Sequence, residues 1–380
     1  MKNRLLIITC HKLDENNGGA NASKAFIRCF AALFDDCSLI YPEFEETMPY
    51  IPSKYKRYPC HDSRSKVRKA IDMYRGVVGG LYYCVRAHLR EHQYDIIVVD
   101  HSATSTALLR TIRQTGAKLI TIHHNVERDY LRDNGKERPL TYRIPYTYFA
   151  KKAERDSLRC SDLNLTLTEQ DAEVFRCWYA DLCVRHWGTF QWQPIKDKTL
   201  EERTPGQTFI ITGSLGFLQS LLPITEFVRS YWPLVRKVCP QARLLIAGRN
   251  PHRKLMQACT GQGDISIIPS PDNMDTLVEQ ADYYICPINA GSGLKLRIMD
   301  ALKQGLPVVC HQVSATGYEP LAESGALFVY RDEGTFSEAL RQLLAARTKR
   351  QDIYQAYKAL FSPEGGTARL RTILTEENII

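Results

Sequence analysis

Short runs of apolar residues without polar alternation recur along the first half of the chain. Such runs suit strands that are covered on both faces, and they lie at residues 5–9, 96–99, 118–122 and 163–167. A loop with Gly18 and Gly19 follows the first run. After it the apolar positions recur with the period of a helix, at Ala22, Ala25, Phe26, Cys29, Phe30 and Leu33. A strand, a glycine loop and a helix form the first unit of a parallel sheet.

The same order of elements starts again after a polar stretch. Residues 188–206 contain two prolines and no clear apolar period, which is typical of an interdomain linker. Beyond it we expect strands at 208–212, 243–247, 265–268, 283–286 and 307–310, and helices from about Leu222, after Pro271 and from about Leu294. The sequence therefore predicts an α/β fold of two doubly wound, Rossmann-like domains, at 1–187 and 207–361. We interpret 362–380 as a closing helix that returns to the N-terminal domain.

The composition agrees with two globular domains. The chain has 380 residues, of which 44% are apolar and 24% are charged, a balance typical of folded proteins. The first apolar run is too short for a signal peptide, and no stretch approaches the ~20 apolar residues of a membrane span. The 12 cysteines form no Cys-x-x-Cys pair. We interpret them as reduced thiols and expect a cytoplasmic protein.

Much of the net charge of +8 is concentrated in one segment. Residues 54–75 hold eight cations and two carboxylates, and Val67, Ile71, Tyr74 and Val78 follow a helical period there and just beyond. A basic amphipathic helix can rest on an anionic membrane surface, so we predict such a surface as a partner, at the cytoplasmic face. The alternative is an ordinary helix whose apolar stripe faces the core. No nucleic acid is expected, because nothing resembles a known binding module.

The stretch from Cys286 to Val309 carries the most informative pattern. A predicted strand ends at Cys286, and Gly291 and Gly293 allow the backbone to turn tightly and approach a ligand. The helix expected after them would point its free N–H groups into this loop. Free N–H groups at the start of a helix bind anions, so the pattern predicts an anion site.

Three charged side chains add chemistry to this loop. Lys295 and Arg297 supply positive charge, and Asp300 is spaced to accept hydrogen bonds from a diol such as a ribose. Each feature alone has an ordinary explanation, namely a tight turn, a solvated helix face or a surface aspartate. Together they lie between two strands of a parallel sheet, where such folds bind their ligands.

Residues 291–309, GSGLKLRIMDALKQGLPVV, resemble the donor-site signature of the retaining family-four, or group 1, glycosyltransferases. The resemblance implies the GT-B fold, in which two Rossmann-like domains face each other across a cleft. It also implies a nucleotide-sugar donor whose diphosphate faces Lys295 and Arg297 and whose ribose is held by Asp300. The implied donor-binding residues are Gly19, Gly213, Ser214, Arg249, Gly291, Ser292, Gly293, Leu294, Lys295, Arg297 and Asp300.

A pair of histidines follows the predicted strand at 118–122. Similar family members often carry a His-Asn pair at this point, with the histidine near the transferred sugar. The resemblance therefore makes His124 the candidate catalytic residue, a group that hydrogen-bonds the donor sugar as its bond to phosphate breaks. The alternative is a histidine that satisfies a buried carbonyl. Glu154 matches an acidic position common in relatives, and an ordinary helix-surface glutamate explains it equally well.

The predicted function is transfer of a sugar, with retention, from a nucleotide sugar to a glycan or lipid-linked glycan in polysaccharide biosynthesis. We expect no metal or other cofactor, because no Asp-x-Asp element lies in a strand-end loop. Three departures from the family pattern leave alternatives open. Ser292 and Asp300 stand where many members have glutamates, and residues 215–219 lack the usual Arg and Lys. The alternatives are a non-catalytic nucleotide-sugar-binding relative and a nucleotide-sugar epimerase of the same fold.

Overall fold

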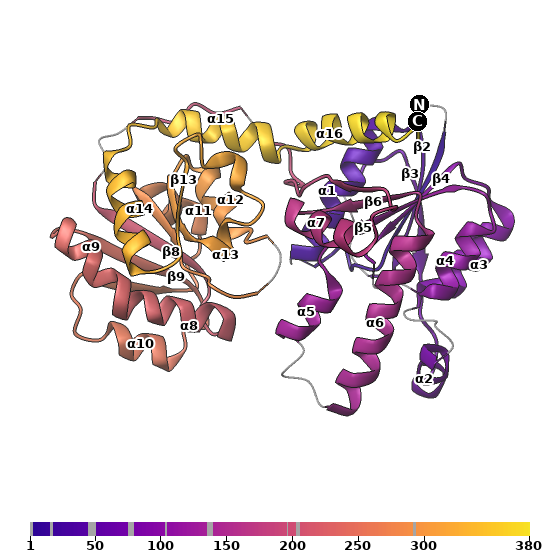
Figure 1. Cartoon of the computed structure of the whole chain (residues 1–380), viewed down its shortest axis with the longest axis horizontal. Helices are drawn as coiled ribbons and strands as arrows, with labels where there is room; N and C mark the ends of the chain where they lie inside the picture. The colour runs from indigo at the N-terminus through magenta and orange to yellow at the C-terminus, as the bar shows by residue number, and fades with distance from the viewer. Residues whose placement is uncertain are drawn as a thin grey trace. The chain divides into compact units, whose positions relative to one another are not determined.

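The computed structural model describes residues 3–15, 18–44, 51–74, 80–102, 105–134, 140–195, 197–202, 206–291 and 294–380. The chain forms two compact units. The first joins Met1–Ile195 with Phe361–Ile380, and the second is Lys196–Leu360. Each unit is built on one parallel sheet flanked by helices (Figure 1). The predicted fold of two doubly wound α/β sheets is therefore confirmed.

The sheet of the first unit has seven strands in the order β3-β2-β1-β4-β5-β6-β7. They are β1 (Arg4–Thr9), β2 (Asp36–Pro42), β3 (Tyr55–Cys60), β4 (Ile96–Asp100), β5 (Lys118–His123), β6 (Leu163–Thr166) and β7 (Val184–His186). The chain runs outward from β1 in one direction and then returns to β4 on its other side. This reversal makes the carboxyl ends of β1 and β4 a topological switch point, where open α/β sheets bind ligands.

Helices cover both faces of this sheet (Figure 1). They are α1 (Gly18–Leu33), α3 (Leu81–Glu91), α4 (Thr106–Arg113), α5 (Glu127–Asn134), α6 (Leu140–Cys160), α7 (Glu169–Trp178) and α16 (Pro363–Glu376). A further helix, α2 (Lys66–Tyr74), lies away from the sheet (Figure 1). Leu5 and Ile7 of β1 pack into the core beneath α1 and α16, whereas Leu6 and Ile8 pack into the core beneath α3 and α4. Successive strand residues face opposite sides. Because β1 is covered on both sides, all of these positions must be apolar, which explains the unbroken apolar run.

The last helix of the chain belongs to the first unit. Its N-cap, Ser362, accepts a hydrogen bond from the N–H of Gly365 at 3.0 Å. Trp187 is fully buried and its Nε1–H donates to the carbonyl of Gly366 at 2.9 Å. The apolar face of α16 contacts α1, with Leu370 and Leu374 in the shared core.

The second unit has six strands in the order β10-β9-β8-β11-β12-β13. They are β8 (Thr208–Ser214), β9 (Arg243–Arg249), β10 (Ile265–Pro269), β11 (Tyr283–Cys286), β12 (Val308–His311) and β13 (Leu327–Tyr330). The helical segments of this part of the chain are α8 (Leu218–Glu226), the π-helical turn η2 (Phe227–Tyr231), α9 (Trp232–Val238), α10 (Arg253–Cys259), α11 (Met274–Gln280), α12 (Arg297–Lys303), α13 (Gln312–Ala315), the 3₁₀ turn η3 (Glu319–Leu321), α14 (Glu333–Ala345) and α15 (Arg350–Phe361).

Several elements differ from the sequence prediction. β2 and β3 were not predicted, and β3 lies inside the basic segment 54–75. It is an edge strand with exposed Lys56 and Arg57, and an edge strand tolerates charge on its free side. The helix expected from about Leu222 begins at Leu218, and the one expected from about Leu294 begins at Arg297.

The interpretation of all cysteines as reduced thiols is wrong for two of them. Cys60, at the end of β3, and Cys84, in α3, form a disulfide. Their separation of 24 residues gives no spacing signal, because only the packing of α3 against the sheet brings the two sulfurs together. The other ten cysteines are free. Among the described helices, none is long and apolar enough to cross a bilayer.

Candidate active site

Three neighbouring strands of the first sheet are each followed by a histidine. His11 follows β1, His101 follows β4 and His124 follows β5. Since parallel strands end at the same edge, the three rings meet. The ring centroids of His11 and His124 are 4.9 Å apart, those of His101 and His124 are 5.3 Å apart, and those of His11 and His101 are 5.4 Å apart. We call His11, His101 and His124 the histidine cluster.

His124 is held by a buried carboxylate. Its Nε2 lies 2.6 Å from Oδ1 of Asp100, the last residue of β4, and the hydroxyl of Thr9 donates to Oδ2 of Asp100 at 2.8 Å. Burial raises the pKa of Asp100, but the neighbouring charge and hydrogen bond of His124 outweigh it and bring the pKa below its usual range. An ionised Asp100 therefore accepts the Nε2–H of His124, and Nδ1 is the ring atom left for a ligand.

His101 has a backbone conformation that side chains rarely adopt. Its φ is 104°, in the left-handed region where a non-glycine residue is strained. Its Nε2 lies 3.4 Å from Oε1 of Glu127, the first residue of α5. Burial lowers the pKa of His101 well below its usual value and raises the pKa of Glu127 to about 7. Strain and shifted pKa values gather at functional sites, and here they occur together.

Glu154 of α6 is linked to this cluster through Glu127. Its Oε1 accepts the backbone N–H of Glu127 at 2.6 Å, which caps the start of α5. The residue is only 2% exposed, so the interpretation of a helix-surface glutamate is wrong. Burial raises the pKa of Glu154 to about 8.

Gly19 lies in the first turn of α1 rather than in a loop before it. A Cβ at Gly19 would lie 2.5 Å from Cε1 of His11, so the glycine makes room for the histidine cluster. Nε2 of His11 is buried and has no hydrogen-bond partner among the described residues. A buried nitrogen without a partner is costly, and a ligand hydroxyl could satisfy it.

His123, by contrast, is a core residue. It is fully buried, its Nε2 lies 2.9 Å from Oδ1 of Asn164, and its ring packs on Phe175. Burial lowers its pKa to about 4. His123 is thus a core histidine that is bonded at one ring nitrogen, since its Nδ1 is buried without a partner among the described residues, whereas His124 points to the other side of the strand end.

In the second unit, the side chain of Arg297 joins the carboxyl end of β8 to the start of α8. Its Nη1 donates to the carbonyl of Thr212 at 3.0 Å and its Nη2 donates to the hydroxyl of Ser220 at 3.1 Å. A Cβ at Gly213 would lie 2.5 Å from Nη1. The guanidinium thus braces the end of β8, and only a glycine at position 213 lets it come so close. That Arg297 also faces a diphosphate stays a prediction.

The loop before α12 is held by Lys295. Its ammonium donates to the carbonyl of Gly291 at 2.8 Å, and the hydroxyl of Tyr318 donates to the carbonyl of Lys295 at 3.0 Å. Gly291 has a φ of 89°, which favours glycine. Leu294 is partly buried. The predicted site residues Ser292 and Gly293 lie outside the described residues.

The remaining predicted donor residues lie at the same edge of the second sheet or near it. Ser214 and Arg249 are opposite one another at the ends of β8 and β9, and both are exposed. Asp300 lies in the first turn of α12. Burial, and then the charge of Asp275, raise the pKa of Asp300 to about 6. It is therefore mainly a carboxylate at neutral pH and can accept hydrogen bonds from a diol.

Two family models match the two halves of the chain. The model described as Glycosyltransferase Family 4 matches residues 16–181, and the one described as Glycosyl transferases group 1 matches residues 208–346. The chain belongs to the group 1, family 4 glycosyltransferases. Such an enzyme uses a nucleotide-sugar donor. No curated protein matches this glycosyltransferase significantly.

Solved structures with similar folds cover essentially the whole chain. Sucrose-phosphate synthase from Thermosynechococcus elongatus is 13% identical with a TM-score of 0.67, covering 99% of both chains. HepE from Anabaena, solved in complex with UDP, is 12% identical with a TM-score of 0.65, covering 98% of this chain and 100% of its own. The lipopolysaccharide outer core galactosyltransferase WaaB is 10% identical with a TM-score of 0.66, covering 98% and 99%. At these identities the likeness shows the fold, which is GT-B.

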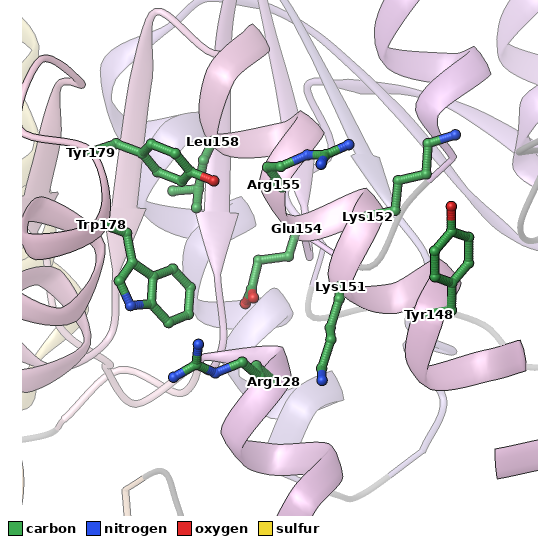
Figure 2. A pocket seen from close by; sticks show the side chains of 9 residues that line it. All are labelled: Arg128, Tyr148, Lys151, Lys152, Glu154, Arg155, Leu158, Trp178 and Tyr179. Carbon is green, nitrogen blue, oxygen red and sulfur yellow. The ribbon is translucent and has the colours of Figure 1, made fainter. Parts of the chain in front are cut away.

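The first unit of this glycosyltransferase also contains a cavity of about 490 Å³ between α5, α6 and the end of α7. It falls within the usual size of small-molecule sites. Figure 2 shows Trp178 and Tyr179 on one side and the cations of α6 on the other, with Glu154 between them. We call this the basic pocket. Its lining residues are Arg128, Tyr148, Lys151, Lys152, Glu154, Arg155, Leu158, Trp178 and Tyr179.

Sequence reasoning missed Asp100, His11 and His101 as members of the site around His124. A signal was present, because each of the first three central apolar runs ends beside a histidine. The strand order was needed to see that these three ends are neighbours. The cations of the basic pocket gave no signal, since a basic helix such as α6 is most often simply solvated.

Proposed function

We propose that this glycosyltransferase transfers a sugar from a uridine diphosphate sugar to a glycan or lipid-linked glycan in polysaccharide biosynthesis, with retention at the anomeric carbon. HepE, which shares the fold, was solved with UDP and with UDP and glucose, and this supports a uridine donor. WaaB, by its name, acts on the lipopolysaccharide outer core. This supports an acceptor of the polysaccharide or lipid-linked class.

In this proposal the second unit binds the nucleotide. Lys295 and Arg297 face the diphosphate and offset the negative charge that develops as the bond between sugar and phosphate breaks. Gly213 and Gly291 let the backbone approach the phosphates closely, and Asp300 holds the ribose diol.

The first unit acts on the sugar. Asp100 fixes the orientation of His124, so that Nδ1 forms a hydrogen bond with a hydroxyl of the donor sugar. The orphan Nε2 of His11 supplies a second polar contact. The observation that carries the proposal is the buried Asp100–His124 pair, at 2.6 Å, beside the strained His101 at the switch point of the sheet. An imidazole that is held in one orientation at the switch point of the sheet is suited to binding a ligand, here the donor sugar, rather than to packing in the core.

Thermal unfolding with a panel of nucleoside diphosphates tests the donor assignment. UDP at a hundredfold excess over its dissociation constant stabilises the fold by ~2.7 kcal/mol, which shifts the unfolding midpoint. We expect Lys295→Ala and Asp300→Ala to abolish the shift, and UDP-sugar hydrolysis without acceptor to fall in His124→Ala while the UDP shift stays. If UDP gives no shift but another diphosphate does, the uridine assignment is wrong. If no diphosphate does, the proposal fails.

We also propose that α2 contacts an anionic membrane surface at the cytoplasmic face. Val67 is 69% exposed and Ile71 is 44% exposed, so these two side chains do not face the core. Part of the nearby positive charge is neutralised within the segment, since Arg64 pairs with Asp62 at 2.8 Å and with Asp72 at 3.1 Å. The apolar residues therefore have to contribute much of the binding.

Vesicle flotation tests this contact. We expect the protein to float with phosphatidylglycerol vesicles and to lose most of that binding in the double variant Val67→Ser, Ile71→Ser. The matched control is Val238→Ser, because Val238 is 53% exposed on α9. Equal flotation of the wild type and the double variant would overturn the proposal.

A further inference from the structure

The basic pocket has one aromatic wall. Trp178 and Tyr179 are both partly buried and line the cavity from the end of α7. The guanidinium of Arg128 lies 4.6 Å from the centre of the Trp178 ring, a cation–π contact that keeps this wall in place. Aromatic rings that line a cavity are suited to the apolar face of a sugar ring.

The opposite wall is rich in positive charge. Lys151 and Lys152 lie on consecutive positions of α6 and make no ion pair within the described part of the chain. Arg155 pairs with Asp156 at 3.4 Å. Arg128 is a fourth cation and lies 3.8 Å from a carboxylate oxygen of Asp129. Among the described residues that line the pocket, Glu154 is the one with an acidic side chain. Lys151 and Lys152 therefore supply positive charge that no carboxylate among the described residues pairs with, and a polar but neutral ligand would not use it.

We propose that the basic pocket binds the acceptor and selects acceptors that carry a phosphate or diphosphate group beside a sugar ring. The phosphate oxygens lie among Lys151, Lys152 and Arg155, and the ring stacks on Trp178. Charge-assisted hydrogen bonds to several cations are the strongest polar contacts available for such a group. A single carboxylate on the ligand would leave one of the two lysines unmatched.

The pocket is linked to the histidine cluster through two buried glutamates. Glu154 lines the pocket and accepts the backbone N–H of Glu127, whose own carboxyl lies 3.4 Å from His101. Glu154 and Glu127 thus separate a ligand in the pocket from His101, whose ring centre is 5.3 Å from that of His124, the residue that is proposed to hold the donor sugar. This inference rests on the proposed function, because only a sugar transfer gives the pocket an acceptor to bind.

Lysine protection in the full-length wild type tests the pocket without any substitution. The protein is reductively methylated in the presence of glucose 1-phosphate, glucose or neither, and each lysine is read by peptide mass spectrometry. We expect glucose 1-phosphate to slow modification of Lys151 and Lys152 about tenfold and glucose to leave it unchanged. Lys237, an exposed lysine on α9, should react equally in all samples. Protection by glucose as strong as by glucose 1-phosphate would overturn the role of phosphate.

A second arm distinguishes the two sources of a phosphate group. The same reaction is run with phosphatidylcholine vesicles that contain a polyprenyl diphosphate, and with vesicles that lack it. Protection only by the lipid assigns the pocket to a lipid-linked acceptor, and protection only by glucose 1-phosphate assigns it to a free sugar phosphate. If neither ligand protects Lys151 or Lys152, the pocket does not bind phosphate and the proposal is wrong.

Lysine variants then test whether the pocket determines the affinity for the protecting ligand. We expect Lys151→Ala combined with Lys152→Ala to weaken binding of the protecting ligand at least tenfold, and Lys237→Ala to leave it unchanged. UDP stabilisation is measured on the same proteins. If UDP binds normally and the lysine variants bind glucose 1-phosphate and polyprenyl diphosphate like the wild type, the pocket inference fails while the donor proposal stands. If UDP does not stabilise the wild type, the donor proposal fails instead.

Discussion

Oδ1 of Asp100 and Nε2 of His124 are 2.6 Å apart, and both side chains are buried. The other carboxylate oxygen of Asp100 accepts a hydrogen bond from Thr9. A carboxylate that is bound at both oxygens cannot rotate, so it fixes the tautomer and the orientation of the imidazole. Asp100 is thus a positioning residue for His124, and it comes from the strand next to it.

Substituting Asp100 tests that relationship. Asp100→Asn keeps the shape but removes the charge, and the new NH₂ group favours the opposite histidine tautomer. We expect kcat for sugar transfer or donor hydrolysis to fall about a hundredfold, with an altered pH profile of kcat and unchanged UDP binding. Asp181→Asn, an exposed position, is the matched control. An unchanged kcat and pH profile in Asp100→Asn would show that the pair is merely structural.

Glu154 should make stability depend on pH. Burial raises its pKa from 4.5 to about 8, so above pH 4.5 the folded state keeps a proton that the unfolded state has lost. The stabilisation is complete below pH 4.5 and disappears as the pH rises through about 8. Glu154→Gln removes this titration, while its side-chain carbonyl can still accept the N–H of Glu127.

Urea unfolding at a series of pH values measures the effect. We expect the free energy of unfolding of the wild type to fall with pH more steeply than that of Glu154→Gln, by up to about 1.4 kcal/mol per pH unit. Glu173→Gln, an exposed position on α7, should keep the slope of the wild type. Parallel curves for the wild type and Glu154→Gln would mean that the carboxyl titrates normally.

Gly248 is a point where two strands approach too closely for a side chain. A Cβ there would lie 1.7 Å from the carbonyl oxygen of Gly213, which belongs to the paired strand β8. Gly248→Ala should therefore cost more than about 3 kcal/mol of unfolding free energy and disturb the turn above Arg297. Gly263→Ala is the control, because nothing lies within 4 Å of its Cβ. Similar unfolding free energies for the two variants would contradict this account.

The disulfide between Cys60 and Cys84 should contribute to stability. Closing a loop of 24 residues restricts the unfolded chain and is worth about 3 kcal/mol in the chain-entropy model. We expect dithiothreitol, or Cys60→Ser with Cys84→Ser, to lower the free energy of unfolding by that order. The double variant should no longer respond to dithiothreitol. Intact mass measured with and without a thiol-alkylating reagent checks that the bond forms. Without dithiothreitol the wild type should take up ten alkyl groups, one on each free cysteine, and uptake of 12 would disprove the disulfide.

Most central strands of both sheets could be predicted from the sequence, because a strand buried on both faces must be apolar along its whole length. The central strand β2 was missed. Residues 5–9 and 96–99 show this plainly. The edge strand β3 could not be predicted, since Lys56 and Arg57 on its exposed side break the apolar run. Edge strands carry charge without loss of pairing, so pattern alone is weakest there.

The candidate site was predictable where its residues are close in sequence. The turn that holds Gly291 and Lys295 is local, and its glycine and lysine could be read directly. The partners of His124 were not predictable in this way, because Asp100 lies 24 residues away and meets it only through the pairing of β4 with β5. The bracing of Thr212 by Arg297, 85 residues apart, likewise depends on the fold.

Substitution of Arg297 distinguishes a role in bracing β8 from a role in binding the ligand. Its guanidinium reaches the carbonyl of Thr212 and the hydroxyl of Ser220 at the same time, and a lysine has no planar fork that can do so. Arg297→Lys keeps the charge, so a residue that only braced the turn would lose stability but keep its UDP affinity. We expect the UDP affinity to fall about tenfold in calorimetry, because the predicted diphosphate contact needs the guanidinium in this position. Arg341→Lys on α14 is the control, and an unchanged dissociation constant in Arg297→Lys would reduce Arg297 to a brace.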